Sequence, residues 1–107
     1  MRKLITLMVV AALTAALAMS ATMAFAATKK VGVRGLKFSP KTLRVKKGTT
    51  VKWSWSGAVP HNVVGKGFKS KTAGKVTFSK KFTKKGTYRY VCTIHKAQGM
   101  SGVIKVS

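Results

Sequence analysis

The stretch Val51-Lys52-Trp53-Ser54-Trp55 alternates strictly between apolar and polar side chains. A period of two is typical of a β-strand that buries one face, whereas a helix would repeat its apolar residues every three to four positions. We therefore expect Val51, Trp53 and Trp55 to lie on the inner face of a strand, with Lys52 and Ser54 on its outer face.

Similar short segments lie on both sides of this stretch, and turn residues separate them. The alternating segments are Val31–Val33, Leu43–Val45, Val76–Phe78, Tyr88–Cys92 and Val103–Val106, and the turns are marked by Phe38-Ser39-Pro40, Lys46-Lys47-Gly48 and Lys84-Lys85-Gly86. No segment has a helical stripe, so the pattern predicts an all-β sandwich or small barrel. The stretch Val64–Gly74 is rich in glycine, lysine and serine, and is expected to be a long exposed connection.

The beginning of the chain has the features of an export signal. Arg2 and Lys3 precede the almost unbroken apolar run Leu4–Met19, and Ala24-Phe25-Ala26 fits the small-x-small cleavage rule. We expect residues 1–26 to be a signal peptide and residues 27–107 to be one small domain, exported to the periplasm, the cell surface or the medium. The alternative is an uncleaved anchor, since Leu4–Ala27 is long enough to span a bilayer.

The charge of the chain is entirely basic. It has 22 Lys and Arg residues and no Asp or Glu, and 20 of the basic residues follow Ala26. Without carboxylates the chain has no Ser-His-Asp triad, no acidic general acid or base, and no carboxylate cage for Mg²⁺ or Ca²⁺. The sequence therefore argues against an enzyme, and it predicts that self-repulsion lowers stability at low ionic strength.

The residues after Ala26 include one cysteine, two histidines and one methionine. Three of them form the pattern Cys92-x-x-His95-x-x-x-x-Met100, and the fourth lies in Pro60-His61-Asn62. A strand that ends at Cys92 and continues into a tight loop would direct the first three toward one point, and His61 would complete the set. A thiolate, two imidazoles and a weak thioether are the ligands of a mononuclear electron-transfer copper site, so we expect one copper ion per chain.

Each of these residues also has an ordinary explanation when it is taken alone. A buried free cysteine is commonly an inert small hydrophobic residue, and a single histidine is usually not a ligand. An exported chain with one cysteine has an intermolecular bridge, a free thiol or a metal thiolate, and copper ligation explains Cys92 best. Zinc could occupy the same residues, but Met100 is a poor reason to choose zinc.

The run Tyr88–Met100 resembles the C-terminal copper loop of the plastocyanin/amicyanin group of cupredoxins. The patterns in the first half that are similar to this group are Phe38-Ser39-Pro40, Leu43-x-Val45, Lys47-Gly48-x-x-Val51-x-Trp53 and Pro60-His61-Asn62-Val63-Val64. This resemblance implies a Greek-key β-sandwich of roughly seven to eight strands that carries single electrons. It also implies that His61, Cys92 and His95 are the strong ligands and Met100 the long axial one.

The resemblance assigns roles to residues beside the ligands. Asn62 and Thr93 become candidates for hydrogen bonds that tie the two ligand loops together near the cysteine sulfur, although an asparagine here is also an ordinary turn residue. A flat apolar docking patch around His95 would be formed by Val59, Pro60, Ala97 and Gly99, whose alternative is ordinary loop composition. Trp53, Tyr88 and Tyr90 are expected to be core residues and not an electron relay.

These observations leave two main hypotheses for function. The first is an exported blue copper electron carrier, and the second is a copper storage or delivery protein with the same ligands. A basic nucleic-acid or surface binder is the third and least supported, since no stacking platform is evident. The chain departs from plant plastocyanins at Val91 and Ile94 and has no acidic patch. We therefore expect its partner to be an acidic redox protein or an anionic cell-surface component. We expect the protein itself to be a monomer.

Overall fold

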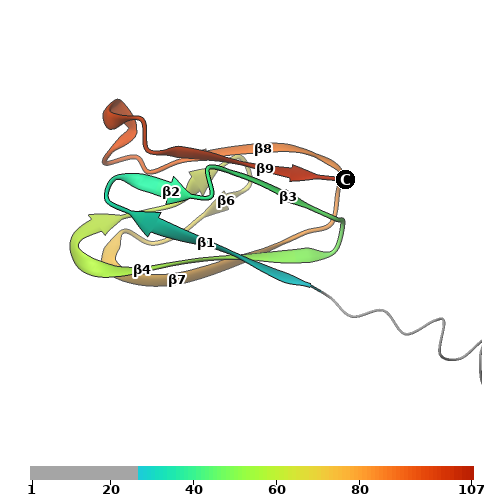
Figure 1. Cartoon of the computed structure of the whole chain (residues 1–107), viewed down its shortest axis with the longest axis horizontal. Helices are drawn as coiled ribbons and strands as arrows, with labels where there is room; N and C mark the ends of the chain where they lie inside the picture. The colour runs from blue at the N-terminus through green and yellow to red at the C-terminus, as the bar shows by residue number, and fades with distance from the viewer. Residues whose placement is uncertain (1–26) are drawn as a thin grey trace, which may run out of the picture.

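The computed structural model describes residues 27–107, which form two β-sheets packed face to face (Figure 1). Nine strands and one short 3₁₀-helix lie within this range. The predicted all-β sandwich is therefore confirmed, with nine strands where roughly seven to eight were expected. The proposed signal peptide and its cleavage after Ala26 lie outside the described residues and stay predictions.

The first sheet has the strand order β2-β1-β4-β7. Its strands are β1 (Thr28–Arg34), β2 (Lys37–Ser39), β4 (Thr49–His61) and β7 (Ala73–Phe82). β1 pairs with β4 in parallel and with β2 in antiparallel, and β4 pairs with β7 in antiparallel. The alternation at Val51–Trp55 falls in β4, where the three apolar side chains are buried as predicted.

The second sheet has the order β3-β9-β8-β5-β6. Its strands are β3 (Thr42–Val45), β5 (Val64–Gly65), β6 (Phe68–Lys69), β8 (Gly86–Val91) and β9 (Ser101–Val106). β8 pairs in antiparallel with β9 and β5, while β3 pairs with β9 in parallel. The short helix η1 (Lys96–Gln98) lies in the loop between β8 and β9.

The core between the sheets is centred on Trp53, which is fully buried. Aromatic rings from both sheets surround it, with Tyr90 at a centroid distance of 5.3 Å and Phe68 at 5.9 Å. The predicted core role of Trp53 and Tyr90 is confirmed, and Tyr88 is only partly buried against the same cluster. Because residues 28–106 supply every described strand and the whole of this core, a chain of residues 27–107 contains the complete sandwich.

The prediction of a long exposed connection at Val64–Gly74 is wrong. β5 and β6 form a small hairpin in this stretch, and Phe68 and Ser70 are buried. The hairpin packs the Phe68 ring against Trp53, so the stretch closes one side of the core. The glycine and lysine residues at the turn are typical of a loop, and they obscure the structural role of the Phe68 ring.

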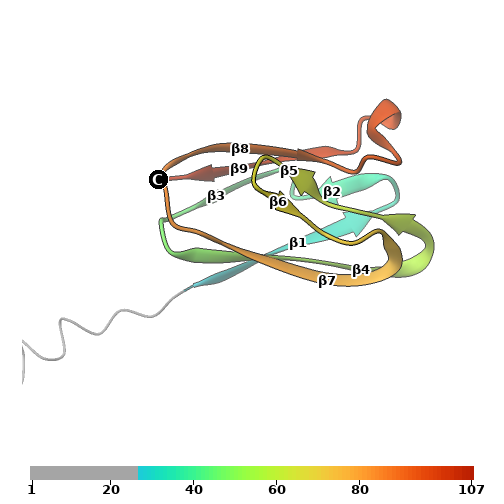
Figure 2. The ribbon, with the colours of Figure 1, turned by 180° about the vertical axis from the view of Figure 1, so that it is seen from behind.

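Two strands end side by side at one end of the sandwich. β4 ends at His61, and β8 ends at Val91, directly before Cys92. Figures 1 and 2 show that the loop containing η1 lies at this end, whereas the C-terminus lies at the opposite end. Within residues 27–107, no helix has the length and apolar character needed to cross a membrane.

Candidate metal centre

The loop from Cys92 to Met100 begins where β8 ends and folds back on itself. The Cys92 amide donates a hydrogen bond to the Met100 carbonyl (3.0 Å), and the Met100 amide donates to the His95 carbonyl (3.2 Å). Gly99 has a φ of +82°, in the left-handed region, where the absence of a Cβ avoids a steric penalty. The backbone of this loop therefore brings Cys92, His95 and Met100 close together, as their spacing predicts.

His61 reaches the same end of the sandwich from β4. The pairing of β4 with β7 shifts register between Ser56 and His61, so the strand is irregular just before the histidine. Beyond it, Val63 and Ser70 are held together because the Val63 amide donates to Ser70 Oγ and the Ser70 amide donates to the Val63 carbonyl, both at 2.8 Å. An irregular strand end followed by a pinned turn directs the His61 side chain toward the loop after β8.

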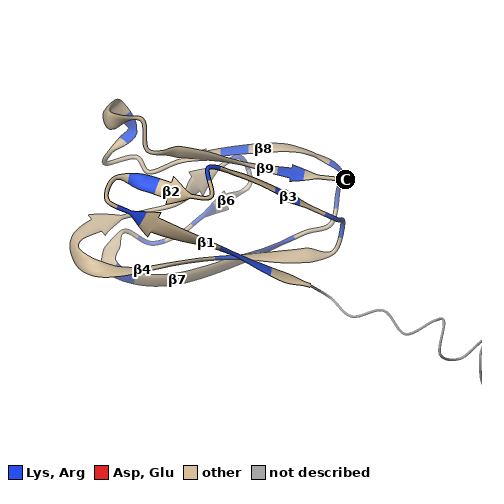
Figure 3. Cartoon of the chain, in the orientation of Figure 1, with Lys and Arg blue, Asp and Glu red and all other residues tan. Residues whose placement is uncertain are grey.

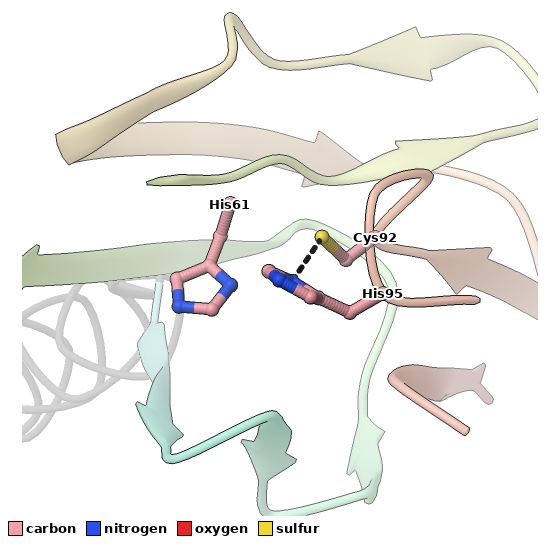
Figure 4. Close-up of side chains that lie close together, drawn as sticks. All are labelled: His61, Cys92 and His95. Carbon is pink, nitrogen blue, oxygen red and sulfur yellow. Dashed lines mark hydrogen bonds between the residues drawn. The ribbon is translucent and has the colours of Figure 1, made fainter. Parts of the chain in front are cut away.

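The donor atoms of His61, Cys92 and His95 converge (Figure 4). One ligand atom from each residue lies within 4.8 Å of the other two. Cys92 Sγ is 3.5 Å from His95 Nδ1, and the two imidazole ring centroids are 5.0 Å apart. Three of the four predicted ligands are thus close enough together for a single metal ion to contact all of them.

Met100 completes the predicted ligand set in the same loop. Its side chain is fully buried, and its backbone is hydrogen bonded to both Cys92 and His95. The thioether is therefore shielded from solvent, on a residue whose backbone contacts two of the stronger ligands. Its role as the axial ligand stays a prediction.

His61 has the electrostatic properties of a ligand that is ready to bind. Its side chain is 5% exposed, and Nδ1 has no hydrogen-bond partner among the described residues. Burial lowers the pKa of His61 below its ordinary value of 6.5, and the neighbouring His95 lowers it further. A neutral imidazole with a buried, unpaired nitrogen is costly by itself, and a metal ion at this point would remove that cost.

The donor set fits copper in particular. A thiolate and two neutral imidazoles, with a buried thioether available in the same loop, are the ligands that copper accepts in both of its common oxidation states. A zinc site would ordinarily take a fourth strong ligand, and residues 27–107 offer only these three strong donors within reach. The chemistry of the site therefore agrees with the predicted cofactor.

Asn62 joins the two ligand-bearing segments. Its Nδ2 donates to Thr93 Oγ1 (2.8 Å) and to Thr72 Oγ1 (2.9 Å), while its Oδ1 accepts from the Thr93 amide (2.8 Å). The residue after His61 is thus tied to the residue after Cys92, which is the contact that the sequence led us to expect. Thr72 was not identified from the sequence, because a threonine in a polar stretch carries no signal of such a contact.

The residues of the proposed docking patch lie at the surface around the site. Val59, Pro60, Ala97 and Gly99 are exposed and His95 is partly exposed. Val59 is 47% exposed and Ile94 is 45% exposed, and they are the large apolar side chains that face solvent most openly in the described chain. Ile94 had been noted only as a departure from the plastocyanin pattern, and its exposure beside His95 adds it to the patch.

A pocket of about 190 Å³ lies beside His61. Val33, Trp55 and the segment 56–59 line it together with His61. Trp55 meets the His61 ring edge-on at a centroid distance of 6.1 Å, and its Nε1 donates to the Ala73 carbonyl (2.9 Å). Trp55 therefore packs its ring against the histidine, a contact that strand alternation alone does not reveal.

Comparison with known families places the chain among copper-binding proteins. The model of a family described as copper binding proteins, plastocyanin/azurin family, matches residues 23–107. The match includes every strand of the two sheets and all four candidate ligands.

Individual relatives agree with the family match. Halocyanin of Natronomonas pharaonis is 41% identical over 83 residues, covering 70% of this chain and 51% of halocyanin. Amicyanin-alpha of Methylorubrum extorquens is 37% identical over 78 residues, covering 65% of this chain and 66% of that protein. The chain therefore spans about half to two thirds of the length of these two relatives.

Solved structures show the same fold. A purple cupredoxin from Nitrosopumilus maritimus superposes with a TM-score of 0.64 at 27% identity, covering 74% of this chain and 99% of that one.

Proposed function

The chain belongs to the plastocyanin/azurin family of copper-binding proteins, and from that premise we propose that it is an exported mononuclear blue copper protein that shuttles single electrons between redox partners. The observation that carries the proposal is the convergence of the His61, Cys92 and His95 donors, which lie within 4.8 Å of one another. The proposed role is that of a carrier and not of an enzyme, since both histidines are used as ligands and the chain has no carboxylate side chain.

The protein's contribution is to hold its donors still. Bound copper would supply the chemistry by alternating between Cu(II) and Cu(I) and thus accepting and releasing one electron. Cys92 offers its thiolate from a buried position directly after β8, and the hydrogen bonds of the Cys92–Met100 loop fix the backbone that carries that sulfur. Asn62 holds the His61 segment against Thr93, so the distance between the two ligand-bearing segments is set by the fold.

Electrons would enter and leave through His95. Its ring is partly exposed, whereas Cys92 and Met100 are fully buried and His61 is nearly so. Ile94 directly before it and Val59 two residues before His61 provide exposed apolar side chains, and a partner that docks there would exclude water from the contact.

Charge indicates the kind of partner. With 20 Lys and Arg residues after Ala26 and no acidic side chain, the domain would be attracted to an acidic redox protein or to an anionic cell-surface component. Export is supported by the basic, apolar and small-residue pattern of residues 1–26.

The second candidate function is copper storage or delivery, which uses the same donors. The partial exposure of His95 favours delivery, because an incoming chelator could displace this ligand first. An electron carrier should exchange electrons rapidly between its own oxidised and reduced forms and should retain Cu(I) when a chelating protein is added.

The two functions can be separated on one sample of copper-loaded protein. For a carrier, we expect NMR lines of a mixture of Cu(I) and Cu(II) protein to broaden because electrons exchange rapidly between the two forms. We also expect the Cu(I) protein to lose its copper only slowly to a competing chelator. Slow self-exchange combined with rapid loss of Cu(I) would reject the carrier and support delivery.

A further inference from the structure

The outer face of the β2-β1-β4-β7 sheet has an unusual composition, because its side chains are of only two polar kinds. The strand registers and the burial of Val31, Phe38, Trp53 and Val76 establish which residues point outward. The outward positions are six cations (Lys30, Arg34, Lys37, Lys52, Lys75, Lys81), seven hydroxyl residues (Thr28, Ser39, Thr50, Ser54, Ser56, Thr77, Ser79) and Gly32. Figure 3 shows basic residues along the strands of this layer.

Two pairs of cations on this face lie directly opposite one another. Lys30 is paired with Lys52 across β1 and β4, and Arg34 is paired with Lys37 across β1 and β2. Like charges at directly opposite positions destabilise a sheet. With no Asp or Glu in the whole chain, no acidic side chain can relieve this repulsion from within the protein. An external anion laid along the face would relieve it.

The outer face of the other sheet is different. Val64, Val91 and Val103 point outward there and are partly buried, and four cations accompany them: Arg44, Lys69, Arg89 and Lys105. This face is therefore part apolar, whereas the face of the first sheet has neither an apolar nor an aromatic side chain among its described outward positions. Cations can therefore be removed from either face in turn, and the two results compared, to separate the effect of this face from the effect of total charge.

The absence of an apolar anchor distinguishes between possible partners. Tight protein interfaces rely on buried aromatic, aliphatic or arginine anchors and are depleted in lysine, so this face is poorly suited to a protein partner. An anionic bilayer attracts each lysine or arginine near its surface separately and needs no apolar anchor. The strands are about 4.8 Å apart, so the four-stranded face spans roughly 15 Å and can meet several headgroups at once.

We propose that the outer face of the β2-β1-β4-β7 sheet docks on a bilayer that contains anionic phospholipids. Its six cations would lie against the headgroup phosphates, and the serine and threonine hydroxyls between them would donate hydrogen bonds to phosphate oxygens. Binding would be peripheral and reversible by salt, because no side chain of the face is able to insert into the hydrocarbon layer.

This orientation leaves the metal centre accessible. The loop that contains η1 belongs to the opposite layer, at one end of the sandwich (Figure 1). A protein lying on this face would therefore keep His95 clear of the bilayer and open to partners moving along the same surface. The proposal itself does not rest on the copper function, because the charged face and the metal donors share no residue.

The test uses residues 27–107, sedimentation with vesicles, and two variants of equal net charge. The first variant replaces four cations of the docking face (Lys30→Gln, Lys52→Gln, Lys75→Gln, Lys81→Gln), and the second replaces the four cations of the other face (Arg44→Gln, Lys69→Gln, Arg89→Gln, Lys105→Gln). Vesicles of phosphatidylcholine with an equal part of phosphatidylglycerol are compared with vesicles of phosphatidylcholine alone. Circular dichroism verifies that each variant is folded.

We expect the unmodified domain to bind the anionic vesicles and not the neutral ones. The first variant should bind roughly 600-fold more weakly, since each of the four cations removed from near the anionic surface contributes about fivefold, and the second should lose less than about fivefold. Equal losses in both variants would show that only total charge matters and would overturn the proposal. It would also be overturned if the domain bound soluble polyglutamate or DNA but not anionic vesicles at the same salt concentration.

Discussion

At the residue scale, the metal centre contains a histidine donor that is unfavourable by itself in the position it occupies. Cys92 is fully buried with its sulfur 3.5 Å from His95 Nδ1, and the buried Nδ1 of His61 has no partner among the residues that the structure describes. Burial of a polar atom without a hydrogen bond costs free energy, and a bond from that atom to a metal ion offsets the cost. Copper should therefore raise the stability of the domain as well as supply its function.

Met100 gives the first prediction at this scale. Met100→Leu keeps the size of the buried side chain but removes the thioether, so we expect copper to stay bound while the reduction potential rises. The rise should be on the order of 60 mV, which for a one-electron couple is a tenfold change in the equilibrium. Voltammetry of the two copper-loaded proteins provides the measurement. An unchanged potential would show that Met100 does not contact the metal.

His61 gives a prediction about pH for the metal-free domain. Burial and His95 lower its pKa below 6.5, so the unfolded chain takes up a proton at a higher pH than the folded chain does. The contribution of His61 to the free energy of unfolding should therefore be constant well above pH 6.5 and should fall as the pH decreases through 6.5 into the interval below it. Urea titrations at a series of pH values would show this, and His61→Gln should reduce the dependence. A stability that rises on acidification through this interval would contradict the assignment.

At the scale of elements, the Asn62 side chain joins the end of β4 to the loop after β8. Asn62→Ala removes three hydrogen bonds, and we expect it to lower the free energy of unfolding by about 2–3 kcal/mol, at about 1 kcal/mol for each bond. Thr72→Val removes only one of the three, so its cost should be near 1 kcal/mol. Chemical denaturation of both variants measures the difference, and equal stabilities would show that the contact between the segments contributes little.

The elements also show what a sequence reveals and what it hides. β4 was predictable because its alternation persists over enough residues for the period to be visible, and the Cys92–Met100 loop was predictable because its ligands are of rare residue types. β5 and β6 have two residues each, which is too short for any period to appear. The tie between Asn62 and Thr72, and the packing of Trp55 against His61, depend on contacts between segments distant in the sequence, and local patterns carry no information about them.

At the scale of the whole molecule, the lack of acidic side chains leaves the repulsion between the basic side chains of the domain uncompensated. Lys and Arg residues lie on both sheets and in the turns between them, and Figure 3 shows no acidic residue among the described ones. The Debye length falls from about 30 Å at 0.01 M salt to about 8 Å at 0.15 M, so added salt should screen most of this repulsion.

We therefore expect the melting temperature of residues 27–107 to rise by several degrees over this range of sodium chloride concentration. Differential scanning calorimetry would measure the rise, with an uncharged solute at equal osmolarity as the control. A melting temperature that is constant, or that falls with salt, would show that the charges are too well solvated to repel.

The account depends most on the claim that His61, Cys92 and His95 bind a single copper ion. The most direct test is to titrate the folded, reduced domain of residues 27–107 with Cu(II) and to record its visible spectrum beside that of Cys92→Ser. We predict an intense blue band that saturates at one copper per chain and is absent from the variant. A domain that is folded and reduced but stays colourless, or a Cys92→Ser protein that still turns blue, would contradict the claim.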